Sequence, residues 1–375
     1  MNGRAKLVSA GLGTAALAVA GAWSAEVLRQ RPPGYEIRPT PIGSVVLHTG
    51  DHLGLPVGIE SVGDHLVVID RAGEKNVHVV DSETGELVAS VGRPGDGPAE
   101  FRGPNAITRD PAGRVWVFDA QVQRMTRLDL GRLSDGDAWA DGSFRLASNS
   151  RVIDLTWTAD ADMLAWGQFL NGRYGRLSDT GELKYETGSF PEEAAGEPAF
   201  LNQQVYRVRL GARPDGRLFA AAAHHAGRID ILDAAGERVA GAAVPLPFAP
   251  VYEVRTGGAW PVAVFTEDSP LGYIDVATTD RFVFGLFSGR TEADFPGRFG
   301  YASDVHVFDW AGNLVDILRL DRDVSAIEVD TSRDRLFAIQ HDPMPAILEF
   351  DLPENMRERT QRTEVALAPG VGGLR

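Results

Sequence analysis

The chain of 375 residues contains no cysteine. This absence excludes a disulfide framework, and it excludes the lipid-modified cysteine that anchors bacterial lipoproteins. Positive charge is in short supply as well, since the formal net charge is -15 at pH 7. A chain this acidic argues against nucleic acid, and against an anionic membrane surface, as its partner.

The common catalytic signatures are also missing. The sequence has no cysteine nucleophile, no GxSxG elbow, no HExxH pair and no phosphate-binding loop. Asp and Glu are plentiful, so a pair of carboxylates is available by chance and identifies no reaction. No segment has the pattern of a long amphipathic helix, which favours an all-β fold.

The sequence does contain a repeated unit, most clearly in residues 91–129. Three short apolar runs, NAITR, RVWVFD and RMTRLD, follow a Gly/Pro-rich loop and are separated by turns. β-branched and aromatic residues in such runs are typical of buried strands. The pattern predicts a three-stranded antiparallel meander, which cannot bury both of its faces alone.

The unit recurs about every fifty residues, a period typical of propellers and solenoids. The second strand is repeated six times, as HLVVID, RVWVFD, DMLAWG, RLFAAA, RFVFGL and RLFAIQ. An Asp near the end of the third strand is followed by a Gly that can adopt positive φ, which predicts a β-turn. These pairs are Asp81/Gly85, Asp179/Gly181, Asp233/Gly236 and Asp309/Gly312.

Six copies predict an all-β fold, a six-bladed β-propeller of four-stranded antiparallel blades. The sixth copy has no clear fourth strand after Asp351, and residues 43–48 (GSVVLH) are predicted to supply it and close the ring. We expect a signal peptide or N-terminal anchor at 1–24, a linker at 25–42, the propeller at 43–353 and a C-terminal tail at 354–375.

The stretch GPAEFRGPNAITRDPAGRVWVFDAQVQRMTRLD resembles an NHL repeat. The chain as a whole is similar to exported bacterial six-bladed propellers of the NHL and TolB-like kind. This resemblance implies the fold but little about function, because propellers host binding proteins and several classes of enzyme.

The long insertions are predicted to share one face of the ring. Loops that enter an innermost strand, and loops between second and third strands, lie on the same face of a propeller. Residues 92–104, 188–202, 245–270 and 288–303 all belong to these two classes, whereas the opposite face is predicted to carry tight turns. This asymmetry favours one ligand-binding face, although the insertions are equally compatible with ornament packed on the rim.

Nine residues on that face are candidate ligand-binding residues: Arg71, Arg93, Arg102, Asn105, His224, Tyr252, Trp260, His341 and Asp342. Arginines can clamp an anionic group, or they can pair with nearby carboxylates such as Asp96 and Glu100. Histidines can meet at the channel mouth and bind a metal, or they can bond backbone carbonyls. The aromatic side chains can stack on a sugar, or they can fasten the insertion to the rim.

Two functions remain open. The first is an exported, periplasmic or extracellular binding module for a small molecule, glycan or protein, touching a membrane only through an uncleaved N-terminal segment. The second follows from a resemblance to gluconolactonase-type propellers, which hold a divalent cation with Glu, Asn and Asp of innermost strands. That resemblance implies a metal-dependent hydrolase or lyase with Ca²⁺ or another divalent cation at Glu60, Asn105, Asp154 and Asp275.

Overall fold

The computed structural model describes residues 38–256 and 261–357. The expected signal peptide or anchor, most of the linker, most of the C-terminal tail and Trp260 lie outside the described residues.

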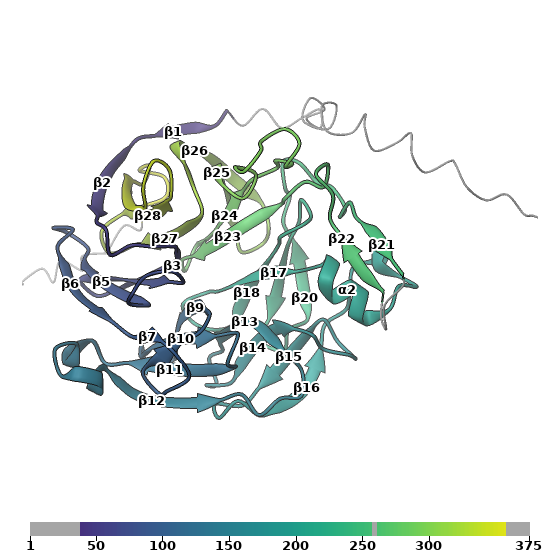
Figure 1. Ribbon diagram of the computed structural model, residues 1–375. Helices are drawn as coiled ribbons and strands as arrows, with labels where there is room; N and C mark the ends of the chain where they lie inside the picture. The colour runs from purple at the N-terminus through teal and green to yellow at the C-terminus, as the bar shows by residue number, and fades with distance from the viewer. Residues whose placement is uncertain (1–37, 257–260, 358–375) are drawn as a thin grey trace, which may run out of the picture.

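Six antiparallel sheets stand around a common axis, as the sequence predicts (Figure 1). Blade 1 consists of β3 (Pro56–Val62), β4 (His65–Asp70), β5 (Val77–Asp81) and β6 (Leu87–Val91). Blade 2 consists of β9 (Pro104–Arg109), β10 (Val115–Asp119), β11 (Arg124–Leu128) and β12 (Ala140–Arg145). Blade 3 consists of β13 (Val152–Trp157), β14 (Met163–Gly167), β15 (Tyr174–Leu177) and β16 (Leu183–Thr187). Blade 4 consists of β17 (Val208–Ala212), β18 (Leu218–Ala223), β19 (Ile229–Asp233) and β20 (Arg238–Gly241). Blade 5 consists of β23 (Tyr273–Thr278), β24 (Phe282–Phe287), β25 (Ala302–Asp309) and β26 (Leu314–Val324). Blade 6 consists of β27 (Ala326–Asp330), β28 (Arg335–Gln340), β29 (Ala346–Asp351) and β2 (Ser44–Thr49).

The ring is closed by the N-terminal strand, which confirms the sequence-based prediction. β2 pairs antiparallel with β29, so that Ser44 lies opposite Phe350. The residues just before it were predicted to belong to a linker, but they form β1 (Thr40–Ile42), which pairs parallel with β26. β1 therefore adds a fifth strand to blade 5, and the N-terminal segment covers the outer edges of two neighbouring blades.

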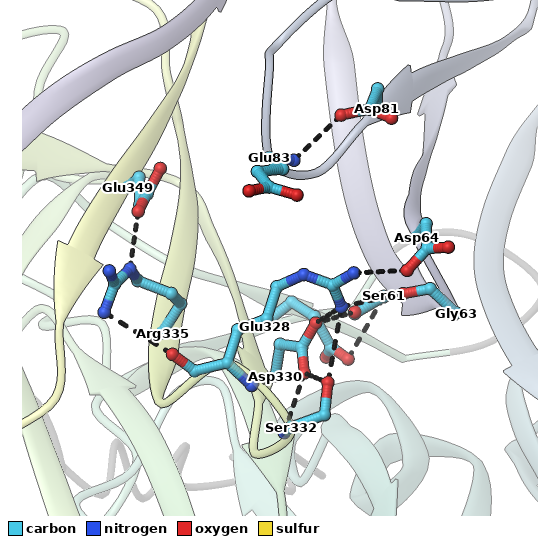
Figure 2. Close-up of polar contacts among 11 residues, drawn as sticks. Ser61, Gly63, Asp64, Asp81, Glu83, Glu328, Asp330, Ser332, Arg335 and Glu349 are labelled. Atoms are coloured by element: carbon cyan, nitrogen blue, oxygen red, sulfur yellow. Dashed lines mark hydrogen bonds and ion pairs between the residues drawn. The ribbon is translucent and has the colours of Figure 1, made fainter.

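Polar contacts join blades 6 and 1 at the closure (Figure 2). Ser61 Oγ donates to Asp330 Oδ2 at 2.8 Å, and Arg333 donates to the Gly63 carbonyl at 2.9 Å and to Asp64 Oδ1 at 2.6 Å. These contacts join segments that lie almost at opposite ends of the sequence, which adds directional bonds to the strand pairing of β2.

The hydrophobic core lies between neighbouring blades, as both-face burial of the second strands requires. All five residues of β10 are buried, because its two faces pack against different neighbours. Trp116 and Phe118 pack with Leu155 and Trp157 of blade 3, whereas Val115 and Val117 pack with blade 1. The alternation of β10 thus divides one strand between two interblade cores.

The predicted β-turns are stabilised by a side-chain oxygen that accepts backbone hydrogen bonds, and in one copy this oxygen belongs to a serine rather than an aspartate. Asp233 Oδ1 accepts hydrogen bonds from the amides of Ala235 and Glu237, and Gly236 has φ of 83°. In the copy at residues 178–182 the acceptor is Ser178 rather than the predicted Asp179, because the strand ends one residue earlier.

The long loops lie on one face, but the opposite face is not made only of tight turns. Strand registers place the loops at 92–104, 188–202, 245–270 and 288–303 at one end of the axis, here called the long-loop end. The other end, called the short-turn end, carries an unpredicted excursion at residues 129–139 between β11 and β12. Trp139 of this excursion is buried and stacks on Phe101, so the long connection contributes to the packing of the blade.

Small elements decorate the insertions. β7 (Arg93–Pro94) pairs with β8 (Glu100–Phe101), β21 (Glu253–Arg255) pairs with β22 (Val262–Val264), and α2 (Ala199–Val205) contacts β22. Among the helices of the described ranges, none is long and apolar enough to cross a membrane.

Candidate functional site: the axial channel

A cavity of about 470 Å³ occupies the axis of the ring. Its walls come from the innermost strand of every blade: β3, β9, β13, β17, β23 and β27. It extends to the turns at residues 110–113, 158–159 and 213–216, all at the short-turn end. In the other direction the lining stops at the second or third residues of the strands, such as Asn105 and Arg209 at second positions.

Carboxylates on the cavity wall bond the free edge of the next innermost strand. Asp154 Oδ2 accepts a hydrogen bond from the Leu210 amide at 3.1 Å, which joins blades 3 and 4. Asp275 Oδ2 accepts from the Ile327 amide at 2.9 Å and joins blades 5 and 6. These amides face the axis with no ladder partner, so the carboxylates satisfy groups that would otherwise be left unpaired.

The remaining junctions have analogous contacts. Glu328 Oε1 accepts from the Ser61 amide at 3.2 Å, between blades 6 and 1. Asn105 Nδ2 donates to the Ile153 carbonyl at 2.7 Å, and Thr278 Oγ1 donates to the Ala212 carbonyl at 2.5 Å. Glu60 and Arg109 form an ion pair at 2.7 Å between blades 1 and 2. A polar side chain of one innermost strand thus contacts its neighbour at all six junctions.

Burial makes these carboxyl groups difficult to ionise. It raises the pKa of Asp275 to about 6, with Arg209 and two backbone amides acting in the opposite direction. Burial also raises the pKa values of Asp154, Glu60 and Glu328, and the proximity of Glu60 adds to the effect at Glu328. Burial therefore disfavours the charged form of each of these carboxyl groups.

The four residues predicted to bind a cation all line this cavity: Glu60, Asn105, Asp154 and Asp275. The structure brings them to one channel but gives each a protein partner, either a backbone group or an arginine. Across residues 38–256 and 261–357, no three His, Asp or Glu side chains are grouped so as to hold a metal ion. The arrangement does not fit a cation, and no catalytic step is assigned to one.

Three arginines lie near one another at the long-loop end of the channel. They form the arginine cluster, which consists of Arg71, Arg207 and Arg209. Arg207 directly precedes β17, and Arg209 is its second residue. Arg71 directly follows β4, donates to the Pro104 carbonyl at 3.0 Å and contacts Asn105 Oδ1. The cluster therefore draws on blades 1 and 4, with Asn105 of blade 2 beside it.

The arginine cluster is buried enough for its positive charges to lower the pKa values of neighbouring guanidinium groups. The pKa of Arg207 falls to about 10, first because the guanidinium is buried and then because Arg209 and Arg71 are close, while Asp154 acts in the opposite direction. The pKa of Arg71 is lowered for the same two reasons, burial and Arg209. Like charges kept together in this way are costly unless another group compensates them.

Two histidines lie beside the cluster. β18 ends at Ala223, so His224 and His225 both lie in the following turn. Their rings are therefore adjacent, with centroids 4.8 Å apart. Burial lowers the pKa of His225 to about 3, and that of His224 well below its ordinary value, so both rings are neutral.

The insertion at 245–270 reaches these histidines. Phe265 stacks on His225 with ring centroids 3.6 Å apart, and Tyr252 lies 6.4 Å from Phe265. Tyr252 also packs against the buried group of α2 that contains Leu201 and Val205. Two insertions thus form a continuous cover beside the long-loop end.

The other predicted ligand-binding residues are engaged with the protein. Arg102 pairs with both oxygens of Asp96 at 2.7 Å, and Arg93 pairs with Glu100 at 2.9 Å, the alternative that the sequence left open.

On blade 6, His341 Nε2 bonds Ser325 Oγ at 2.9 Å, and Asp342 pairs with Arg298 at 3.1 Å. Within the described residues, no hydrogen bond or ion pair joins either residue to the arginine cluster, so their ligand-binding roles stay predictions.

Four residues at the channel or beside it were not predicted from the sequence: Arg207, Arg209, Glu328 and Phe265. A signal for one of them was available, because Arg209 and Asn105 each occupy the second position of an innermost strand. Comparing equivalent positions of the repeats would have placed Arg209 in the channel. Nothing in the sequence indicates that Phe265 stacks on His225.

The chain was compared with known proteins. A curated human relative, NHL repeat-containing protein 3, is 35% identical over 71 residues, which is 19% of this chain and 20% of the relative. The β-propeller domain of Cps50 (Swd1) from Myceliophteria thermophila is matched over 83% of this chain and 100% of that one, at 13% identity and a TM-score of 0.47. Hydrazine synthase of Kuenenia stuttgartiensis is matched over 77% and 94%, at 11% identity and a TM-score of 0.44.

The match to the human relative spans only a fifth of that protein's length, and the similarity to solved structures is too distant to indicate an activity. A family model, described as TolB-like 6-blade propeller-like, matches residues 42–332. That range begins at the end of β1 and includes the innermost strand of every blade, so the chain belongs to the TolB-like six-bladed propeller family.

Proposed function

We propose that the protein is a binding module whose ligand, a small polar molecule, occupies the axial channel. The observation that carries this proposal is the cavity of about 470 Å³ whose walls come from all six innermost strands. Ligand pockets of small molecules begin at about 300 Å³, so the volume is sufficient for a molecule of the size of a monosaccharide or an amino acid.

The rigidity of the wall supports the proposal. The contacts at the six junctions fix each innermost strand against the next, so the cavity is formed before any ligand arrives. A preformed site loses little conformational entropy on binding. The wall still exposes backbone and side-chain polar groups that can orient a hydroxyl-bearing ligand.

Filling the cavity provides the test. Ala106 of β9 and Val276 of β23 both line it, so Ala106→Phe and Val276→Phe obstruct the channel from two sides. The matched control is Val239→Phe on the outer strand β20, where the side chain is 56% exposed. The melting temperature of each protein is measured with a panel of monosaccharides, oligosaccharides, amino acids and short peptides.

We expect a saturable increase in melting temperature with at least one compound for the wild type and the Val239→Phe control, and its loss in both filled variants. A compound that stabilises the filled variants equally would place binding outside the channel. If that compound instead required Tyr252, as judged from Tyr252→Ala, the binding site would be the face formed by the long loops.

Export remains part of the proposal and is supported only by the sequence pattern of residues 1–24. Attaching those residues to a reporter enzyme that is active only after export tests it, with Arg4 and Lys6 replaced by Glu as the control. Retention of the reporter in the cytoplasm would contradict export.

A further inference from the structure

We propose that the arginine cluster binds the oxyanion group, a carboxylate or a phosphate, of a small ligand at the long-loop end of the channel. The cluster shares only Arg209 with the cavity wall, because Arg71 and Arg207 are not among the lining residues, so the proposal does not require a ligand in the cavity.

Arg207 is the central observation. Its side chain has no hydrogen-bond or ion-pair partner within the described part of the chain, whereas Arg93, Arg102, Arg290 and Arg298 of the long-loop face each have one. Arg207 also retains partial contact with solvent, so a ligand can reach it. A largely buried cation without a partner costs stability, and an arriving anion would recover that cost.

The two neighbouring arginines have room for an anion as well. Arg209 has only a distant partner, since its Nη1 lies 4.0 Å from Asp154 Oδ2. Arg71 uses Nε and Nη2 for Pro104 and Asn105, and these bonds orient the guanidinium from the side of blade 2. The planar guanidinium matches two oxygens of a carboxylate or phosphate, which a lysine cannot do.

The acidic groups nearby do not cancel the cluster. Asp119 influences Arg71, but its oxygens accept hydrogen bonds from the amides of Arg102, Gly103, Gln121 and Val122. Asp154 and Asp275 are the other carboxyls, and burial raises the pKa of both. His224 and His225 are neutral. Among the described residues, no hydrogen bond joins these carboxyls to Arg71, Arg207 or Arg209, so the guanidinium donors stay available to an anion.

The test compares Arg207→Gln with Arg102→Gln, an arginine on the same face that is already paired with Asp96. Melting temperatures are measured with inorganic phosphate and with succinate, against sodium chloride at equal ionic strength, so that general screening is held constant. The two anions distinguish a phosphate from a carboxylate site.

We expect phosphate or succinate to raise the melting temperature of the wild type and of Arg102→Gln by several degrees, saturably, and to leave Arg207→Gln unchanged. In chloride alone, Arg207→Gln should be at least as stable as the wild type, because the substitution removes a charge that has no partner. That second result also shows that the variant folds.

Equal responses of Arg207→Gln and the wild type, or no response of the wild type to either anion, would overturn the proposal. A loss of stability of Arg207→Gln in chloride would also overturn it, because the guanidinium would then have a structural partner. Failure in the cavity-filled variants alone would affect only the proposal about the channel ligand.

Discussion

The two ends of the axial channel differ in how their charges are compensated. Along the channel wall, Glu60, Asp154, Asp275 and Glu328 each contact a backbone amide or an arginine of the next blade. At the long-loop end, Arg207 has no such contact among the described residues. Charged groups with fixed protein partners build the ring, whereas a charged group without one is the better indicator of a ligand.

The largest expected effect comes from Asp154, which lies between the two ends. In Asp154→Ala the Leu210 amide loses its acceptor, and Arg209 loses the carboxylate that lies 4.0 Å away. We expect the free energy of unfolding to fall by about 3 kcal/mol, since a buried donor and a partly buried cation lose their partner.

Urea unfolding followed by tryptophan fluorescence measures this loss, with Asp154→Asn as the control that keeps an acceptor. A loss below about 1 kcal/mol in Asp154→Ala would show that the junction contact is dispensable, and the difference between the two ends would disappear.

Asp275 provides the next largest effect, through pH. Burial raises its pKa from 3.8 to about 6, so between those values the folded protein binds more protons at this carboxyl than the unfolded chain does. Stability contributed by this group therefore falls as the pH rises from about 4 to 6, by at most about 3 kcal/mol in total.

Asp275→Asn removes the titration and keeps an oxygen for the Ile327 amide. Calorimetric melting between pH 4 and pH 7 should show that the variant loses less stability than the wild type as the pH rises. Parallel curves would mean that Asp275 titrates normally and that the cavity wall is well solvated.

Asn105 marks the boundary between the two ends, and its removal should have a moderate effect. Asn105→Ala loses the bond to the Ile153 carbonyl and the contact with Arg71, at a cost of about 1 to 2 kcal/mol. Urea unfolding measures the cost. Because Arg71 would then be less well oriented, the response to phosphate or succinate should also weaken, and an unchanged response would separate Arg71 from the anion site.

The smallest expected effect is at Thr278, whose junction contact is uncharged. Thr278→Val removes one donor from the Ala212 carbonyl, and water in the cavity can replace it, so the cost should be below about 1 kcal/mol. Thr278→Ser keeps the hydroxyl and serves as the control. A cost as large as that of Asp154→Ala would mean that charge is not what distinguishes the junctions.

Much of the architecture could be predicted because it is local and periodic. The second strands and the Asp-Gly turns recur about every fifty residues. Because the last repeat lacks a fourth strand of its own, residues 43–48 could be predicted to supply it. The placement of Glu60, Asn105, Asp154 and Asp275 in one channel also follows from their positions in innermost strands. The fifth strand β1 could not be anticipated, because three residues of TPI carry no pattern.

The chemistry of the site was less predictable, because it depends on which side chains meet across blades. Asp154 and Asp275 were expected to be candidate ligands for a cation, yet their partners are the amides of Leu210 and Ile327, which any residue carries. The pairing of Arg102 with Asp96 is local and was foreseen as an alternative. That Arg207 has no hydrogen-bond or ion-pair partner among residues 38–256 and 261–357 depends on the assembled ring and has no sequence signature.

The closing strand has a consequence for biogenesis. Among the described strands of the ring, β2 is synthesised before strands β3 to β26 of blades 1 to 5, yet its partner β29 is synthesised last. Until then a nascent chain exposes an unpaired strand, with Val45 and Val46 still on the outer surface after closure. Two crowded chains can therefore exchange these strands, so refolding at high concentration should yield interlocked dimers unless closure within each chain is faster.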